Sequence, residues 1–249
     1  SNTGTIPTKI MSLAKSETRC VHAACADNHT LVLSDHGQVF GFGLNRSGEI
    51  GQGKSDDVHM YFVPTKIKMS GNALDIVTGR NHSLVTSTEG VHSFGQNMFE
   101  QLGRDVQTGY FPGDVCFKTT KKPRIIQMDA GHTHSVLLDD HGSVYTFGTG
   151  MVGQLGHGEK ECKVKVATRI ELKRKAKEVT TAASTTFVVG FVPFFNISIF
   201  YTNVSSHHSK HTGTGQRYDH DVWSRTFHRR HGRVWKIRVH TSSRAYVTM

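Results

Sequence analysis

The chain has 249 residues, of which 36% are hydrophobic and 25 are glycine, which is enough for one large domain or two small ones with many turns. Its formal net charge of +10 invites a nucleic-acid or acidic-membrane partner, although charge bears on partners rather than on the fold. Zinc-finger spacing is absent from the cysteines, which favours reduced thiols and a cytoplasmic or nuclear protein: Cys20, Cys25, Cys116 and Cys162.

A repeat runs through most of the chain. Near-complete copies begin with ADNHTLVLSDHG at Ala26, GRNHSLVTSTEG at Gly79 and GHTHSVLLDDHG at Gly131. Their marker histidines, His29, His82 and His134, recur 53 and 52 residues apart. The opening segment looks like the end of an earlier copy, because residues 61–69 repeat its P-T-K-I.

Each copy predicts short strands separated by tight turns. Segments such as HTLVLS, QVFGF and HSVLLDD have the apolar content of strands, and Gly37, Gly90 and Gly142 stand where hairpin turns favour a positive φ. Four such strands in a period of about 50 residues are the signature of a β-propeller blade, which buries its faces against its neighbours. We therefore predict an all-β fold of four-stranded antiparallel blades.

One copy also contains a nucleotide-site pattern. Gly148, Gly150 and Gly153 form G-x-G-x-x-G after a strand-like VYTF, and Glu171 follows the last glycine by 18 residues, close to the spacing of a dinucleotide site. The other two copies do not complete the pattern, so the turn interpretation is favoured. We predict neither a cofactor nor a metal ion.

The repeat resembles that of the regulator of chromosome condensation family, whose propellers are seven-bladed rings. The resemblance rests on G-x-x-H-[ST], G-x-V-[FY], [FW]-G-x-N and G-Q-L-G, carried by Gly79, His82, Gly90, Gly95, Asn97, Gln101, Leu102 and Gly103 in the second copy. The third copy carries it through Gly131, His134, Ser135, Gly142, Val144, Tyr145, Phe147, Gly148, Gly153, Gln154, Leu155 and Gly156. The first copy departs at Ala26 and Glu49, and a fourth has Thr185 in the histidine position.

These repeats predict the domain limits. Residues 1–190 form the propeller part, divided into 5–19, 20–72, 73–124, 125–177 and 178–190. About half a ring results, so we expect an incomplete ring and a fragment or isoform of a longer protein. Four side chains of the third copy should pack against a fourth blade that the chain from Phe191 onward does not encode: Val136, Leu138, Val144 and Phe147.

The resemblance implies regulation by protein contact rather than catalysis. A histidine that recurs once per blade is a structural hydrogen-bonding element, since an active site is normally single. The founding member exchanges guanine nucleotide on a Ran-type small GTPase, and such exchange is the alternative function here. The wedge that exchange requires would be an insertion in one blade, and the intervals between copies show none. A non-enzymatic interaction scaffold is therefore the primary prediction.

The contact is predicted in residues 103–124. Tyr110 and Phe111 would be costly to expose without a use, and Lys121 and Lys122 follow them. A packed loop between strands is the open alternative.

Residues 191–249 differ in composition and are predicted to be an irregular or disordered basic tail outside the propeller. Their apolar stretch at 191–201 is too short to span a membrane, so no membrane partner is expected. Basic and aromatic residues could grip phosphates and stack bases, which makes nucleic-acid or chromatin binding a second alternative: Arg229, Arg230, Arg233 and Trp235. A non-native end that stays unfolded is the competing explanation.

Overall fold

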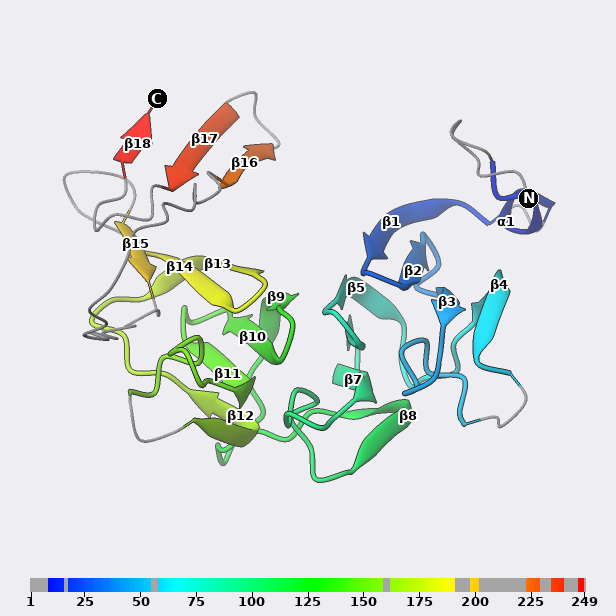
Figure 1. Ribbon diagram of the computed structural model, residues 1–249, viewed down its shortest axis with the longest axis horizontal. Helices are drawn as coiled ribbons and strands as arrows, with labels where there is room; N and C mark the ends of the chain where they lie inside the picture. The colour runs from blue at the N-terminus through cyan, green and yellow to red at the C-terminus, as the bar shows by residue number, and fades with distance from the viewer. Residues whose placement is uncertain are drawn as a thin grey trace, which may run out of the picture. The chain divides into compact units, whose positions relative to one another are not determined.

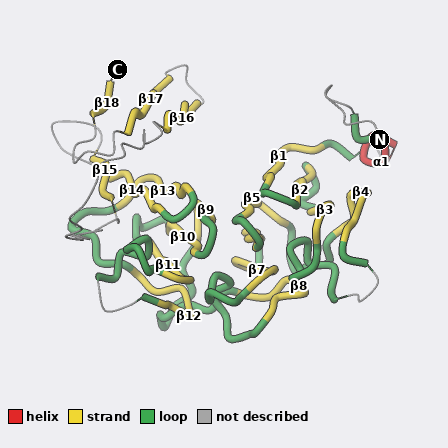
Figure 2. The backbone as a smooth tube through the Cα atoms, viewed as in Figure 1, coloured by secondary structure: helices red, strands yellow, loops and turns green. Residues whose placement is uncertain are grey.

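The computed structural model describes residues 9–15, 18–54, 58–158 and 162–190, together with four short strands beyond them. The chain forms two compact units, Ser1–Ser206 and His207–Met249. The described residues contain one helix, α1 (Met11–Lys15), as Figure 2 shows, and the rest is strand and loop. None of the described helical structure is long and apolar enough to cross a membrane.

The first unit consists of antiparallel sheets whose strands follow one another in chain order (Figure 1). The first sheet contains β1 (Cys20–Cys25), β2 (His29–Ser34), β3 (Val39–Leu44) and β4 (Met60–Lys66). The second contains β5 (Ala73–Thr78), β6 (His82–Ser87), β7 (Gly90–Gln96) and β8 (Thr108–Asp114). The third contains β9 (Ile125–Ala130), β10 (His134–Asp139), β11 (Val144–Thr149) and β12 (Lys163–Arg169). The predicted fold of four-stranded antiparallel blades is confirmed.

A fourth sheet follows, built from β13 (Ala176–Ala182), β14 (Thr185–Gly190) and β15 (Ser198–Tyr201). Because β15 pairs with β14, strand pairing continues past Gly190. The second unit contains a separate antiparallel sheet of β16 (Trp223–His228), β17 (Val234–Val239) and β18 (Tyr246–Thr248). The domain limits drawn from the repeats, including the one at residue 190, stay predictions.

Side chains that alternate along β6 pack at two different interfaces. On β6, Leu84 packs in a cluster with the third sheet, whereas its neighbour Val85 packs in a cluster with the first. Successive side chains point to opposite faces of a strand, and both faces of an inner sheet are covered. This explains why β6 and β10 are buried at every position, although both contain polar residues.

The same alternation corrects one expectation. Val136, Leu138 and Val144 pack against the fourth sheet as predicted, but Phe147 packs in the cluster shared with the second sheet. Val144 and Phe147 are an odd number of residues apart on β11, so they point to opposite faces. The fourth sheet itself is made by residues that include 198–201, beyond Phe191.

The first sheet has one face that no other described sheet covers. Its inner strand β1 is exposed at nearly every position, whereas the equivalent strands β5 and β9 are partly buried by the preceding sheet. Phe40 and Phe42 on β3 are correspondingly only half-buried, while their counterparts Tyr145 and Phe147 on β11 are buried.

Candidate functional site

The marker histidines join neighbouring sheets through a repeated hydrogen-bond relay. Nε2 of His82 lies 2.9 Å from Oγ of Ser135 on the next sheet, and that hydroxyl donates to the carbonyl of Gln101, back on the histidine's own sheet, at 2.9 Å. The other relays have the same geometry: His29, Ser83 and Glu49, then His134, Thr186 and Gln154. The predicted structural role of these histidines is confirmed.

The relay places a hydrogen on Nε2 of each imidazole, and burial keeps the ring neutral. Because the hydroxyl hydrogen goes to a carbonyl, the hydroxyl oxygen accepts from Nε2–H, which leaves Nδ1 as the bare nitrogen of a neutral ring. That Nδ1 is buried without a partner among the described residues in all three histidines. Burial lowers the pKa of His82 to about 3, and of His29 and His134 to about 4.

The glycine pattern of the third copy is structural. Gly148 lies in β11 opposite His134 with a φ of 109°, and a Cβ there would collide with the carbonyl oxygen of Thr133. Gly95 repeats this arrangement in the second copy, where a Cβ would lie 2.6 Å from the Asn81 oxygen. Within residues 144–158 no helix follows the glycines to receive a phosphate. The first glycine of the pattern therefore lies in a strand, and Gly150 and Gly153 lie in the loop that follows it.

Tyr110 and Phe111 lie on β8, the outer strand of the second sheet, next to a turn of the first sheet. The Tyr110 carbonyl accepts a hydrogen bond of 2.9 Å from the Gly53 amide. The Phe111 ring lies against Gly53, where an added Cβ would be 2.6 Å from its Cζ, yet 65% of Phe111 remains exposed. The backbone of this segment thus packs against the first sheet, while the Phe111 ring stays mostly exposed.

Arg104 supports this strand from beneath. Its Nη2 donates to the carbonyls of Ser93 at 3.0 Å and of Phe111 at 2.8 Å. The guanidinium approaches β8 so closely that a Cβ at Gly109 would lie 2.7 Å from Nη2, and one at Gly113 would meet Nη1. Burial lowers the pKa of Arg104. The two glycines of β8 thus leave room for this cation close to the strand.

A cavity of about 390 Å³ opens at this place. It combines two cations with aromatic and small residues, and its lining comprises Lys54, Arg104, Thr108, Gly109, Tyr110, Phe111 and Pro112. We call it the β8 pocket. The sequence analysis missed Lys54, and it included Arg104 in the predicted 103–124 stretch without naming it as a contact residue. The spatial approach of Lys54 to a different repeat carries no signal in one sequence.

Lys122 lies at the far end of β8 rather than in the β8 pocket. Its Nζ donates to the Glu89 carbonyl at 3.0 Å and lies 3.8 Å from the Asp114 carboxylate. Asp114 in turn contacts Nδ1 of buried His92 at 3.0 Å. Lys121 is exposed, and its carbonyl accepts from the Thr119 hydroxyl at 2.9 Å. The four predicted contact residues therefore do not converge on one cavity.

The predicted nucleic-acid residues cannot be placed in the same way. Arg229, Arg230 and Arg233 lie outside the described residues. Trp235 belongs to β17, where its backbone pairs with Phe227 of β16.

Comparison with known families agrees with the repeats. The model of the regulator of chromosome condensation (RCC1) repeat matches residues 36–86, 89–138 and 141–189, and a second model of the same repeat matches residues 20–49. These matches cover more than half of the chain. The chain belongs to the RCC1 repeat family. Each family repeat spans the last two strands of one sheet and the first two of the next, so its limits cross the interfaces that the histidine relays hold together.

Among curated proteins, the RCC1-type chain is 34% identical to mouse probable E3 ubiquitin-protein ligase HERC4 over 156 residues, covering 61% of this chain and 14% of HERC4. It is also 34% identical to mouse protein RCC2 over 154 residues, covering 61% of this chain and 29% of RCC2. The chain therefore spans a minor part of either relative.

Solved structures share the fold. Human WBSCR16 superposes with a TM-score of 0.65 at 20% identity, covering 70% of this chain and 45% of that one. Yeast RCC1 (Prp20), in its complex with Kap60, gives a TM-score of 0.61 at 20% identity, covering 75% of this chain and 45% of that one.

Proposed function

We propose that this RCC1-type chain is a non-enzymatic protein-interaction module that binds another protein through the β8 pocket and the exposed edge beside it. The observation that carries the proposal is the exposed Phe111 ring at the rim of a cavity that also holds Lys54 and Arg104. An aromatic side chain beside a cation is a frequent anchor in protein interfaces. A rigid set of blades presenting variable loops is suited to this role.

The repeated chemical groups support a scaffold rather than catalysis. The three buried histidines face hydroxyls, but each hydroxyl already donates to a backbone carbonyl. A nucleophile would need that proton to pass to the histidine, and the relay directs it elsewhere. That yeast RCC1 (Prp20) forms a complex with Kap60 shows a protein of similar fold bound to a protein partner.

The test compares two aromatic edges of the same chain. Immobilised full-length protein, its Tyr110→Ala/Phe111→Ala variant and a Phe62→Ala control should be incubated with cell extract. Phe62 is 85% exposed on β4, the equivalent outer strand of the first sheet, so its loss removes a comparable exposed ring. Proteins held by the wild type and the control but lost by the double variant support the proposal. Identical sets from all three would refute it.

Guanine-nucleotide exchange on a Ran-type small GTPase remains the runner-up, as does binding of nucleic acid through residues 191–249. Release of a fluorescent guanine nucleotide well above background would establish exchange. Salt-sensitive DNA binding that disappears on truncation at Gly190 would establish the second. We infer a cytoplasmic or nuclear location for the module, with the protein partner as its principal ligand.

A further inference from the structure

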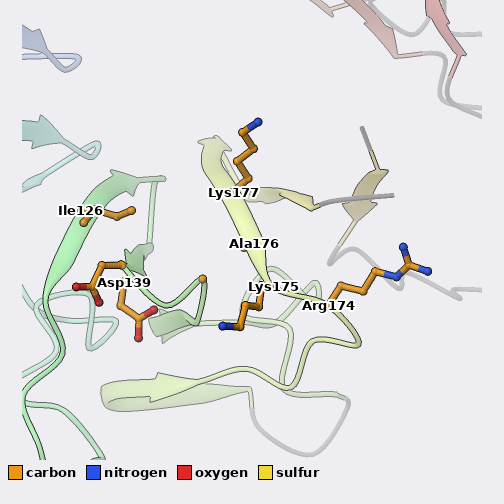
Figure 3. A pocket seen from close by; sticks show the side chains of 8 residues that line it. Ile126, Asp139, Arg174, Lys175, Ala176 and Lys177 are labelled. Atoms are coloured by element: carbon orange, nitrogen blue, oxygen red, sulfur yellow. The ribbon is translucent and has the colours of Figure 1, made fainter. Parts of the chain in front are cut away.

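A larger cavity lies at the junction of the third and fourth sheets, on the end of the blades where the hairpin turns lie. Its volume is about 630 Å³, and its lining comprises Ile126, Asp139, Asp140, Gly142, Arg174, Lys175, Ala176 and Lys177. We call it the junction pocket. Figure 3 shows the β10–β11 turn on one side of it and the start of β13 on the other, with Lys175 directed toward the side where Asp139 lies.

Three of the lining residues are exposed cations, and the equivalent backbone geometry at the first junction forms without cations. The backbone of the junction is fixed by a hydrogen bond of 2.9 Å from the Ala176 amide to the Gly142 carbonyl. The first junction has the same bond, at 2.9 Å, between Ala73 and Gly37. There the residues on either side of Ala73 are Asn72 and Leu74, in the places that Lys175 and Lys177 take at the later junction. The same geometry thus forms without positive charge.

The acidic residues of the junction pocket are already engaged. Asp139 is buried, and its carboxylate accepts from the backbone amides of His141 and Ser143 and from the Tyr145 hydroxyl, at 2.9, 2.7 and 3.1 Å. Asp140 contacts Nδ1 of His141 at 2.6 Å. Asp139 therefore stabilises the hairpin turn, and the Asp140 carboxylate pairs with the His141 ring.

The surroundings contribute one apolar contact and charges of both signs, since the exposed Glu171 and Glu178 flank the pocket cations along the chain. The backbone of Arg124 joins the pocket wall, because the Asp140 amide donates to its carbonyl at 3.1 Å. Lys173 precedes the pocket cations, and Arg124 and Lys173 are both exposed. Ile126 is 57% exposed and offers an apolar surface inside this basic rim. Two connections, β8–β9 with Arg124 and β12–β13 with residues 173–175, thus bring cations to the junction pocket.

We propose that the junction pocket binds an acidic protein segment, whose aspartate or glutamate side chains meet Arg174, Lys175 and Lys177 and whose apolar side chain covers Ile126. Charge complementarity selects the class of partner, since opposite charges steer association and fix its register. The pocket is separate from the β8 pocket, so failure of either surface in its own test leaves the other standing.

The test uses the full chain and a fluorescein-labelled peptide of glutamate and leucine, read by fluorescence anisotropy at low salt. The test variant carries Arg174→Gln, Lys175→Gln and Lys177→Gln. The control carries Lys9→Gln, Lys66→Gln and Lys68→Gln, three exposed cations outside the junction pocket. Both variants lose the same net charge and keep the basic tail, so a difference between them reports the pocket alone.

The test variant should bind the peptide about tenfold more weakly than the wild type, because each exposed charge contributes a modest amount to binding. The control should stay within about twofold, and added salt should weaken the wild type toward the test variant. Equal loss in both variants, or no binding by the wild type, would overturn the proposal. A DNA duplex bound more tightly than the peptide and lost in the same variant would also overturn it, by assigning the surface to nucleic acid. Unchanged thermal midpoints in both variants confirm that folding is intact.

Discussion

The interfaces between sheets and the outer edge of the second sheet use their residues in opposite ways. At the interfaces the same histidine, hydroxyl and carbonyl recur three times with nearly identical distances. At the edge, the residue after the closing glycine is different in every copy: Gln52, Arg104 or His157. Each of these three side chains nevertheless contacts its own sheet. Positions that repeat hold the blades together, and positions that vary within the same geometry are free to carry function.

The largest expected effect is the loss of folding free energy at the interfaces in acid. The marker histidines have pKa values of about 3 to 4 when folded against 6.5 when unfolded, so the unfolded chain takes up their protons first. Stability present above pH 6.5 is then lost as the pH falls toward 4, by about 1.4 kcal/mol per pH unit for each histidine. Urea unfolding from pH 7.5 to 4.5 measures this loss. A free energy of unfolding that does not change across this range would show that the histidines are not buried as neutral rings.

Removing one relay should cost less than acid does, because acid acts on all three histidines. His82→Ala deletes a fully buried ring and leaves the Ser135 hydroxyl without its donor, so we expect a loss of about 3 kcal/mol in the free energy of unfolding. His22→Ala is the control, since His22 is half-exposed and contacts Asp75 on the surface. It should cost less than about 1 kcal/mol. Equal losses would remove the distinction between interface and surface histidines.

The next largest loss of folding free energy is expected for Gly148→Ala in the third copy. Gly148→Ala forces a side chain onto a positive φ and against the Thr133 carbonyl, with an expected cost of about 2 kcal/mol or more. Gly158 also has a positive φ, of 82°, but a Cβ there meets nothing within 4 Å, so Gly158→Ala should cost only about 1 kcal/mol. Thermal unfolding of both variants separates steric contact from backbone preference. A Gly148→Ala protein as stable as the wild type would reopen the question of what this glycine does.

The smallest effect on folding is expected at the edge. Phe111→Ala removes a ring that is mostly exposed, so the free energy of unfolding should change by less than about 1 kcal/mol. Chemical unfolding measures it beside His82→Ala. A loss comparable to that of the histidine variant would mean that Phe111 is a structural residue, and the packed-loop alternative would then stand.

Much of the fold could be predicted from the sequence, because the three copies of the repeat can be aligned with one another. Comparing three copies predicted strands, turns and the structural histidine, and even Glu49, which departs from glutamine, keeps the bond to a backbone amide that Gln101 and Gln154 make. The fourth sheet was harder to predict. Thr185 replaces the marker histidine there, and the third strand, β15, has no repeat signature, because pairing to β14 depends on backbone groups that any residue supplies.

The candidate sites were less predictable for a physical reason. Tyr110 and Phe111 were found from their aromatic character, but Lys54, which accompanies them in the β8 pocket, comes from a turn of the first sheet. The junction pocket gave no sequence signal at all, since Lys175 and Lys177 stand in positions where Asn72 and Leu74 serve equally well for the fold. A role beyond folding becomes visible only when equivalent positions are compared in space.

The most direct test of the account is a hydrogen-exchange footprint of the full chain with and without a protein captured by the β8 edge. The account predicts slower exchange in peptides covering residues 104–114 when the partner is bound. Exchange in β6 and β10, already buried within the interfaces, should stay unchanged. Protection confined to other segments, with residues 104–114 exchanging as in the free chain, would contradict the assignment of binding to this edge.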